Sequence, residues 1–540
     1  MTAATAPPSW EDLVTTALLG TDRRPGRTAE ALLDAAATAT VRRRAGLRPA
    51  EAAPLPSPAP ADDRPDLPPA ARRRLAALLA DRASGGQGGR RTTPDLTELL
   101  PQWLAAAERH GYRAAPELVP ALLDAARART DLRPRALAVA GPLARWLAAL
   151  NPEWKYALRT ATGTAGLPAP DDPAAVQRLW QDGLFAERVA LLTAVRAHDP
   201  DAGRELLAAG WASERAEDRL MFLDSLREGL RPADEPFLEA ALGDRSRHVR
   251  STAAELLSAL PGSGLARRMA ARAGTCVGLD RLAGGGPDGA PAVISVEAPH
   301  ECDAEMQRDG VTPKPPAGRG ERSWWLSQLV EASALGVWTE RLGGRTPAEI
   351  VALPVADDWR DELHAAWCRA AVRQHDPEWS RALLGPPTAP GAAGPGSASL
   401  SERTQLLSVL PAGERALWVA GFISAHGLSE AFQLLGTCAV PWSEPLGGAV
   451  VDALDIARDA GGYPWSFSGV MGLAERCLDP SEAARLDTLT ATPDEPADGS
   501  PGVGAYWSEA FQRLVGTLRL RATMLAELDG TAQESATSGP

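Results

Sequence analysis

The chain has 540 residues, of which 44% are hydrophobic and 23% are charged, a composition typical of globular proteins, and it is too long for one compact core. Its formal net charge of −13 argues against a dedicated nucleic-acid binder, which needs a basic surface to displace counterions. No run approaches the ~18 apolar residues that span a bilayer, so we expect no contact with a membrane.

Cysteine usage and the start of the chain bear on its location. Five cysteines are scattered, odd in number and never spaced Cys-x-x-Cys, which favours reduced thiols over disulfides or a structural zinc site. The beginning of the chain lacks a positively charged stretch and carries Glu11 and Asp12, so we expect no secretory signal. These features predict a cytoplasmic protein.

Two regions precede the main helical part of the sequence. Residues 1–48 predict one or two N-terminal helices. Residues 49–95 are rich in proline and glycine and predict a linker with one short helix at 70–82, because proline does not fit a helix interior.

Residues 96–272 predict a first helical lobe. An Asn-Pro-Glu sequence beginning at Asn151 has the residue types that start helices. Leu192, Leu223 and Leu257 recur at intervals of 31 and 34 residues, a period that suits a repeat of two helices.

The segment 236–261 is the most diagnostic unit of this lobe. It predicts a helix, a turn at Asp244 and a second helix that begins near Val249 and Arg250. This arrangement resembles a HEAT repeat. The second helix should present one apolar face, formed by Val249, Ala253, Leu256, Leu257 and Leu260.

A stretch of 14 residues occurs twice. Residues 194–207 read AVRAHDPDAGRELL and residues 371–384 read AVRQHDPEWSRALL, and nine of the 14 positions are identical. The repeated His, Asp and Arg suggest a pair of active sites. However, Asp199 and Asp376 each precede a proline and an acidic residue, which is how helices begin. We therefore interpret the duplication as architecture.

The two histidines of this duplication fit the same interpretation. His198 and His375 each come directly before a capping aspartate, at the end of the preceding helix. A partly positive ring suits the helix dipole there. A role as a ligand or a catalytic group is the alternative.

The helical pattern stops between the two copies, in residues 273–320. Residues 292–297 alternate and are β-branched, which predicts a short strand or hairpin. Residues 303–310 and 312–320 predict an irregular loop, and a helix restarts at Glu321.

Three regions follow the irregular segment. Residues 321–487 predict a second helical lobe with a flexible insertion at 386–400, residues 488–528 a C-terminal helix region, and residues 529–540 a disordered tail. The predicted fold is therefore all-α: a HEAT-like α-solenoid of helix pairs in two lobes, with a small irregular or β insertion near 274–320.

Known catalytic motifs are missing from the sequence. It contains no P-loop, GxSxG elbow, HExxH or Rossmann glycine motif, so we assign no catalytic residue and expect no cofactor. One mixed group of side chains offers metal ligands, and a charged surface loop explains it equally well. Its weak metal candidates are His300, Cys302, Asp303 and Glu305.

Tryptophan is unusually common, with 16 residues against seven Phe and four Tyr. Most are expected to fill grooves between helices, with the indole N–H bound to a carbonyl. The loop from Arg308 to Trp325 is the place for exceptions, because it interrupts the repeat and Trp and Arg dominate binding hot spots. The interaction candidates there are Arg308, Asp309, Lys314, Arg319, Arg322, Trp324 and Trp325.

Three segments together resemble a known family. They are DRSRHVRSTAAELLSALP at 244–261, MQRDGVTPKPPAGRGERSWWLSQLV at 306–330, and the Pro-Trp pair at Pro441. Over residues 10–486 the chain is similar to an uncharacterised family of bacterial domain-of-unknown-function proteins, common in actinobacteria. The genes of that family lie beside those of a MoxR-type AAA+ ATPase, a von Willebrand factor A (VWA) protein and a SWIM zinc-finger protein. The resemblance implies a scaffold or adaptor in that system, and it supplies no catalytic residues.

Three functions remain open at this point. The first is a non-catalytic scaffold that binds protein partners, such as the AAA+ ATPase or the VWA protein. The second is a HEAT-like nucleic-acid-binding or base-repair protein, which the net charge disfavours. The third is a metal-dependent enzyme that uses the loop 297–305. The sequence leaves the oligomeric state open.

Overall fold

A computed structural model gives the structure of the chain. It describes residues 8–21, 28–45, 56–83, 96–160, 167–168, 170–280, 292–388, 399–491 and 503–530. Several predicted regions lie partly outside the described residues: the N-terminal helices at 46–48, the linker at 49–55 and 84–95, the flexible insertion at 389–398 and the disordered tail at 531–540. By its internal contacts the chain divides into two compact units, Met1–Pro60 and Ala61–Pro540.

The described residues of the first unit form two helices, α1 (Trp10–Leu19) and α2 (Ala29–Ala45). The Ser9 side chain caps α1 by accepting a hydrogen bond from the backbone N–H of Asp12, 3.1 Å away. The guanidinium of Arg43 lies 5.3 Å from the ring centroid of Trp10, so the two helices are joined by a cation–π contact.

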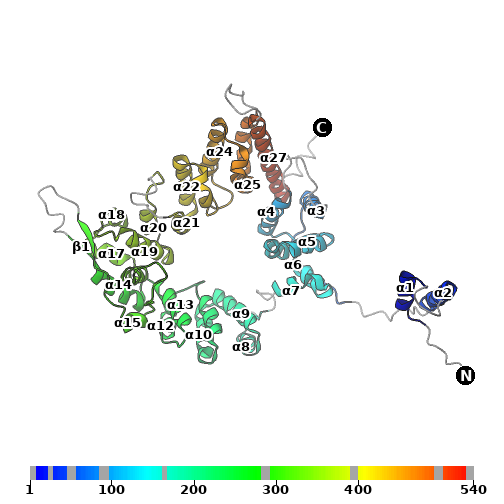
Figure 1. The fold of residues 1–540 in the computed structure, drawn as a ribbon, viewed down its shortest axis with the longest axis horizontal. Coiled ribbons are helices and arrows are strands. Elements are labelled where there is room, and N and C mark those ends of the chain that lie inside the picture. Colours follow the sequence, from blue (N-terminus) through cyan, green and yellow to red (C-terminus); the bar gives the residue numbers. More distant parts are fainter. Residues whose placement is uncertain are drawn as a thin grey trace. The chain divides into compact units, whose positions relative to one another are not determined.

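The second unit is drawn from blue-cyan to red in Figure 1. Its first helices are α3 (Pro69–Ala83), α4 (Leu96–Arg109), α5 (Val119–Ala128), α6 (Arg133–Leu150) and α7 (Lys155–Thr160). The next seven are α8 (Pro173–Asp182), α9 (Phe185–His198), α10 (Pro200–Gly210), α11 (Ala216–Asp224), α12 (Glu235–Ala241), α13 (Arg247–Ser258) and α14 (Gly264–Cys276).

Two short strands follow, β1 (Val277–Asp280) and β2 (Val293–Val296), and they pair antiparallel with Val277 opposite Val296. The predicted strand at 292–297 is thus present. The prediction of an irregular loop at 303–310 is wrong, because α15 (Ala304–Arg308) forms there. The Asp303 side chain starts this helix by accepting a hydrogen bond from the backbone N–H of Met306, 2.7 Å away.

The remaining elements are again helices. They are α16 (Glu321–Ala332), α17 (Gly336–Arg341), α18 (Pro347–Ala352), α19 (Arg360–Arg373), α20 (Pro377–Leu384), α21 (Leu400–Val409), α22 (Ala412–His426), α23 (Leu428–Leu435), α24 (Glu444–Asp459), α25 (Ser468–Cys477), α26 (Ala483–Asp487) and α27 (Val503–Asp529). Short 3-10 helices occur at Pro116–Leu118, Thr130–Leu132, Pro152–Trp154, Trp211–Ser213, Pro232–Asp234, Pro464–Phe467, Pro480–Glu482 and Thr488–Thr490.

The fold is all-α, and within the described residues its one sheet is the pair β1 and β2. None of the described helices is both long and apolar enough to cross a bilayer. Helices that follow one another pack together, as in α9 with α10, α12 with α13, and α19 with α20.

The predicted apolar positions form the core. Leu192, Leu223 and Leu257 are fully buried, and the predicted apolar face of 249–260 is buried as well. Trp338, Trp367 and Trp379 pack ring against ring, with centroids 5.9 and 5.3 Å apart. These tryptophans fill space between helices, as expected, but the indole N–H groups of Trp338 and Trp367 form no hydrogen bond with a described residue, contrary to the expectation that they bind a carbonyl.

The last helix, α27, joins two hydrophobic clusters. Trp507 and Phe511, in its first half, belong to the larger cluster, which extends from Val176. Met524 and Leu528, in its second half, belong to the smaller cluster built by α3 to α7. Figure 1 shows α27 beside α4, so the last described helix packs against one of the first helices of the second unit.

Candidate functional site

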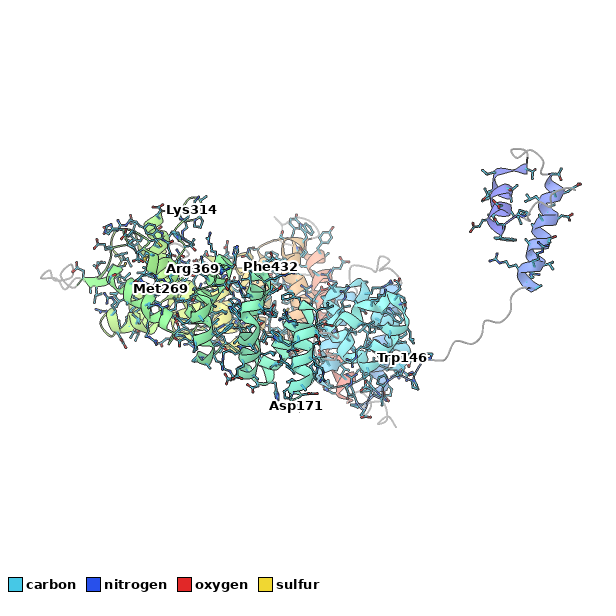
Figure 2. The ribbon with its side chains drawn as sticks, turned by 90° about the horizontal axis from the view of Figure 1, so that it is seen from below. Trp146, Asp171, Met269, Lys314, Arg369 and Phe432 are labelled. Atoms are coloured by element: carbon cyan, nitrogen blue, oxygen red, sulfur yellow. The ribbon has the colours of Figure 1, made fainter. Side chains whose placement is uncertain are left out.

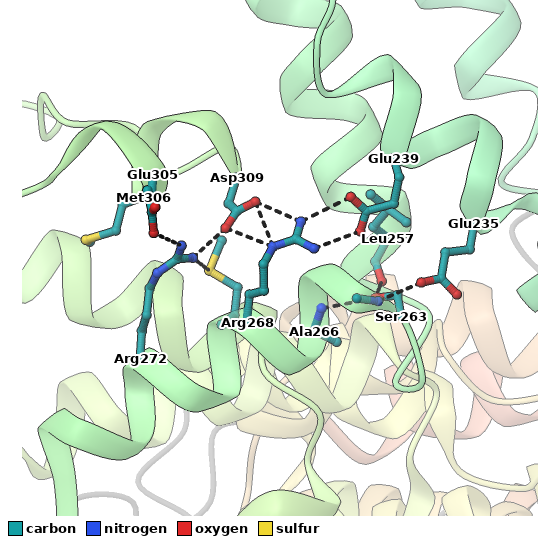
Figure 3. Close-up of polar contacts among 12 residues, drawn as sticks. Glu235, Glu239, Leu257, Ser263, Ala266, Arg268, Arg272, Glu305, Met306 and Asp309 are labelled. Atoms are coloured by element: carbon teal, nitrogen blue, oxygen red, sulfur yellow. Dashed lines mark hydrogen bonds and ion pairs between the residues drawn. The ribbon is translucent and has the colours of Figure 1, made fainter.

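The irregular segment between the two copies is held to the helices by one buried carboxylate. Asp309, at the end of α15, is 6% exposed. Both of its oxygens accept hydrogen bonds from the Nε of Arg268, at 3.0 and 3.1 Å, and Oδ2 also accepts one from the Nη1 of Arg272, at 2.6 Å. Figure 3 shows these bonds joining α15 to α14. We call this group of residues the Asp309 clamp.

The clamp extends to a second helix of the first lobe. Arg268 also donates from Nη1 and Nη2 to the carboxylate of Glu239 in α12, at 3.3 and 3.1 Å. Burial alone would raise the pKa of Asp309, but the hydrogen bonds from the two arginines hold it below its usual value. Asp309 is therefore a charged anchor that ties α15 to α12 and α14.

Two tryptophans hold the rest of the loop. The indole N–H of Trp324 donates to the carbonyl of Thr312, and that of Trp325 donates to the carbonyl of Pro313, both at 2.8 Å. Trp325 is 8% exposed, and Trp324 is half-buried. Both tryptophans lie near the start of α16, and their hydrogen bonds hold the loop against this helix.

Two of the predicted arginines also bind within the molecule. Arg319 forms an ion pair with Glu362, and its guanidinium lies 5.4 Å from the ring centroid of Trp324. Arg322 donates from Nε to the carbonyl of Pro299 at 3.1 Å. These side chains support the loop.

The remaining two candidates are free. Arg308 and Lys314 are exposed, and neither forms an ion pair with a described residue. Figure 2 labels Lys314 at the upper margin of the second unit. The structure thus divides the seven predicted residues into five that hold the loop and two that project from it.

A polar cavity of about 240 Å³ lies behind the loop, lined by residues of α13, α14 and α16 together with Asp309 and Thr312. Arg373 from α19, the repeated arginine of the second copy, lines it as well and forms an ion pair with Glu331. Burial alone would raise the pKa of Glu331, but Arg373 and Arg369 hold it below its usual value. The charges that line this cavity are therefore paired.

The four metal candidates have different structural surroundings. His300 is exposed and lies 3.4 Å from Glu297, while Asp303 caps α15. Cys302 packs against the core, and burial raises the pKa of its thiol. Glu305 lies 3.8 Å from Arg272. Across the described residues no group of three or more His, Cys, Asp or Glu side chains is placed to hold a metal ion.

Two cavities were not predicted from the sequence. One, of about 560 Å³, lies between α4 and α27. The other, of about 260 Å³, is lined by His364 and Cys368 of α19. The four-residue spacing of His364 and Cys368 puts them on one helix face and was a signal for this cavity. The first cavity joins residues more than 400 positions apart, so no local pattern marks it.

Comparisons with known proteins give one result. The model of a family described as a family of unknown function (DUF5691) matches residues 12–528. No curated protein matches the chain significantly.

Proposed function

The chain belongs to the DUF5691 family, whose function is unknown, and we propose that this member is a non-catalytic helical-repeat scaffold that binds protein partners in the cytoplasm. In this proposal the helix pairs stack as HEAT-like units, of which α12 and α13 are one. The packing of consecutive helices on each other supports this arrangement.

The observation that carries the proposal is the loop between the two copies. Its base is fixed by the Asp309 clamp and by the two indole bonds, while Arg308 and Lys314 project into solvent. A loop that is already ordered loses little conformational entropy when a partner binds, so its exposed charges suit recognition. A partner surface that places carboxylates opposite Arg308 and Lys314 would complement the charge of this loop.

Arginine pairing favours a protein partner over a nucleic acid. Many guanidinium groups of the first lobe are already bound to carboxylates and contribute little positive potential. Examples are Arg188 with Glu214, Arg196 with Asp234, Arg219 with Asp244 and Arg227 with Glu255.

Charge reversal in the loop tests the proposal. The resemblance stated above makes a MoxR-type AAA+ ATPase and a VWA protein from the same cell the first partners to try. Each is co-expressed with the full chain and binding is measured by biolayer interferometry. We expect the pair of substitutions Arg308→Glu and Lys314→Glu to weaken binding at least about tenfold, because two attractions become repulsions.

The matched control reverses two exposed charges elsewhere, Arg178→Glu and Arg215→Glu, and should leave binding unchanged. Asp309→Asn should also weaken binding, although Asp309 is buried. The loss of the carboxylate charge breaks the clamp and should lower the free energy of unfolding by about 2–4 kcal/mol. Glu305→Gln, at the exposed edge of the same network, should do neither. Equal binding by the loop variant and the wild type would rule out this loop as the contact.

A further inference from the structure

A cavity of about 560 Å³ lies where α27 meets α4, at the join of the two hydrophobic clusters. This volume is within the range of about 300–1,000 Å³ that small-molecule sites occupy. Met524, Leu525 and Leu528 of α27 and the turn Val440–Pro441 give it apolar walls. Val440 is 57% and Leu525 37% exposed, so the opening is itself apolar.

Two buried donors in the wall have no partner. The Nε1 of Trp103 and the Nε2 of Gln102 are shielded from solvent and form no hydrogen bond with a described residue. Trp103 is 1% exposed and lines the cavity, as does Gln102. The indole N–H groups of Trp338, Trp367 and Trp442 also lack a partner, but none of these residues lines this cavity. A buried donor without an acceptor is costly, and a ligand oxygen would remove that cost once the side chains that cover these two nitrogens move aside.

A buried positive charge completes the wall. Arg521 is 7% exposed and lines the cavity. Its Nη1 donates to the carbonyls of Leu478 and Glu475, at 2.6 and 3.2 Å, and it forms no ion pair with a described carboxylate. Burial lowers the pKa of Arg521, which is the sign of a charge that lacks full compensation.

The other charged residues of the lining cancel this charge only in part: Asp479 attracts Arg521 but forms no ion pair with it. The Oδ1 of Asp479 accepts hydrogen bonds from the backbone N–H and the hydroxyl of Ser481, at 2.9 and 2.6 Å. Glu108 lies 3.9 Å from Arg135, and Arg109 adds a further cation. Three arginines thus face two carboxylates around the cavity.

We propose that the cavity between α4 and α27 binds a fatty carboxylate, with the carboxylate on Arg521, the hydrocarbon chain against the apolar side chains of α27, and the nitrogens of Gln102 and Trp103 uncovered as the ligand enters. Donors that lack acceptors select a ligand that brings acceptors only, and the apolar walls select a chain without polar groups. A peptide fits less well, because the apolar side chains of α27 would leave most of its backbone N–H and C=O groups without partners. Binding at this join would couple the two hydrophobic clusters, a property beyond the scaffold role.

The test uses the full chain and dodecanoate below its micelle concentration, with isothermal titration calorimetry. We expect saturable binding of one molecule with a Kd below about 100 µM, and a Tm that rises with dodecanoate concentration. Dodecanol and dodecyltrimethylammonium, which have the same chain without the negative charge, should bind at least about tenfold more weakly.

Variants distinguish the contribution of the positive charge of Arg521 to binding from that of the cavity volume. Arg521→Met should weaken dodecanoate binding at least about tenfold and leave dodecanol binding unchanged, since only the charged contact is lost. Ala105→Phe should abolish the binding of both, because Ala105 lines the cavity and the ring fills it. Arg519→Met is the matched control: it removes a charge from the same helix, at an exposed ion pair with Asp487, and should change nothing.

Three results would overturn the proposal: no saturable binding of dodecanoate to the wild-type chain, equal affinities for dodecanoate and dodecanol, or tighter binding of a peptide that ends in an apolar residue. If Arg521→Met does not fold, Gln102→Leu gives the same comparison through a neutral donor. The partner-binding test of the loop is independent of all these outcomes.

Discussion

Arg196 and Arg373 occupy the same position in the two copies of the duplicated segment, yet they bind different carboxylates. Arg196 donates to both oxygens of Asp234, at 3.2 and 3.1 Å, and the pair is almost completely buried. Arg373 instead binds Glu331 and donates to the hydroxyl of Ser258 at 3.0 Å. Identical residues thus acquire their roles from the helices around them.

His364 shows the effect of surroundings on a single group. Its side chain is 6% exposed, and its Nε2 has no partner among the described residues. Burial, together with the positive charge of Arg360, lowers the pKa of His364 to about 4. The folded protein therefore keeps this imidazole neutral at pH values where an unfolded chain protonates it.

This shift predicts a pH dependence of stability. Between pH 6.5 and about 4 the unfolded chain binds a proton at His364 that the folded chain does not, so the free energy of unfolding falls as the pH falls, by about 3 kcal/mol in all. His364→Leu should remove this part of the slope in urea unfolding measured from pH 4 to 7. His300→Ala, at a 76% exposed side chain, should keep it. Parallel slopes for the wild type and His364→Leu would contradict the assignment.

At the scale of single elements, the duplicated Asp-Pro pair begins a helix in each of the two copies. The Oδ1 of Asp199 accepts hydrogen bonds from the backbone N–H groups of residues 201 and 202, at 3.0 and 3.1 Å, and starts α10. The Oδ1 of Asp376 accepts them from residues 378 and 379, at 2.9 and 3.0 Å, and starts α20. The prediction that these aspartates begin helices is confirmed.

The helices before these caps end differently. His198 is the last residue of α9, whereas α19 ends at Arg373 and His375 adopts a left-handed φ of 51°. His198 therefore ends its helix as expected, whereas His375 lies two residues beyond the end of α19.

The shared cap predicts equal effects in the two copies. Asp199→Ala and Asp376→Ala should each lower the free energy of unfolding by about 1 kcal/mol, because two backbone donors lose their acceptor. The Asn variants of both positions should recover most of this loss, since the amide oxygen accepts the same bonds. Urea unfolding followed by circular dichroism measures both comparisons. A loss in the Asn variants as large as in the Ala variants would show that charge, rather than capping, matters.

At the scale of the whole molecule, α27 connects the end of the chain to the start of the second unit. In addition to its apolar contacts, α27 makes polar ones: its Glu527 accepts hydrogen bonds from Arg74 of α3 at 3.0 and 2.7 Å. The hydroxyl of Tyr112 donates to the carbonyl of Leu528 at 3.1 Å. Both contacts link residues more than 400 positions apart in the sequence.

Removal of α27 should therefore destabilise both clusters. A chain that ends at Ala491 loses the buried side chains of Trp507, Phe511, Met524 and Leu528, each worth about 1.5–3 kcal/mol, which together rival the ~5–15 kcal/mol stability of a typical protein. Hydrogen exchange should become faster in α4 to α6 and in α24 to α26. A chain that begins at Ala61 is the control, because neither cluster contains a residue before Leu67. Unchanged exchange in α4 to α6 would argue against the connection.

The sequence by itself determined the helices and their buried faces. Caps such as Asp199 and Asp376 and the apolar spacing of 249–260 act over one or two turns, so the residues that cause the structure are adjacent in sequence. The short helix α15 was missed, because its apolar content is one buried side chain, that of Met306.

Only the tertiary structure decided which side chains reach the surface and which groups meet. Asp309 was predicted as an interaction residue, and it is a buried anchor because Arg268 and Arg272 lie on a helix some 40 positions earlier. Arg308, one position before it, remains exposed. The cavity between α4 and α27 likewise joins Trp103 to Arg521. Burial and pairing depend on which distant helices pack together, and a local pattern contains no record of that packing.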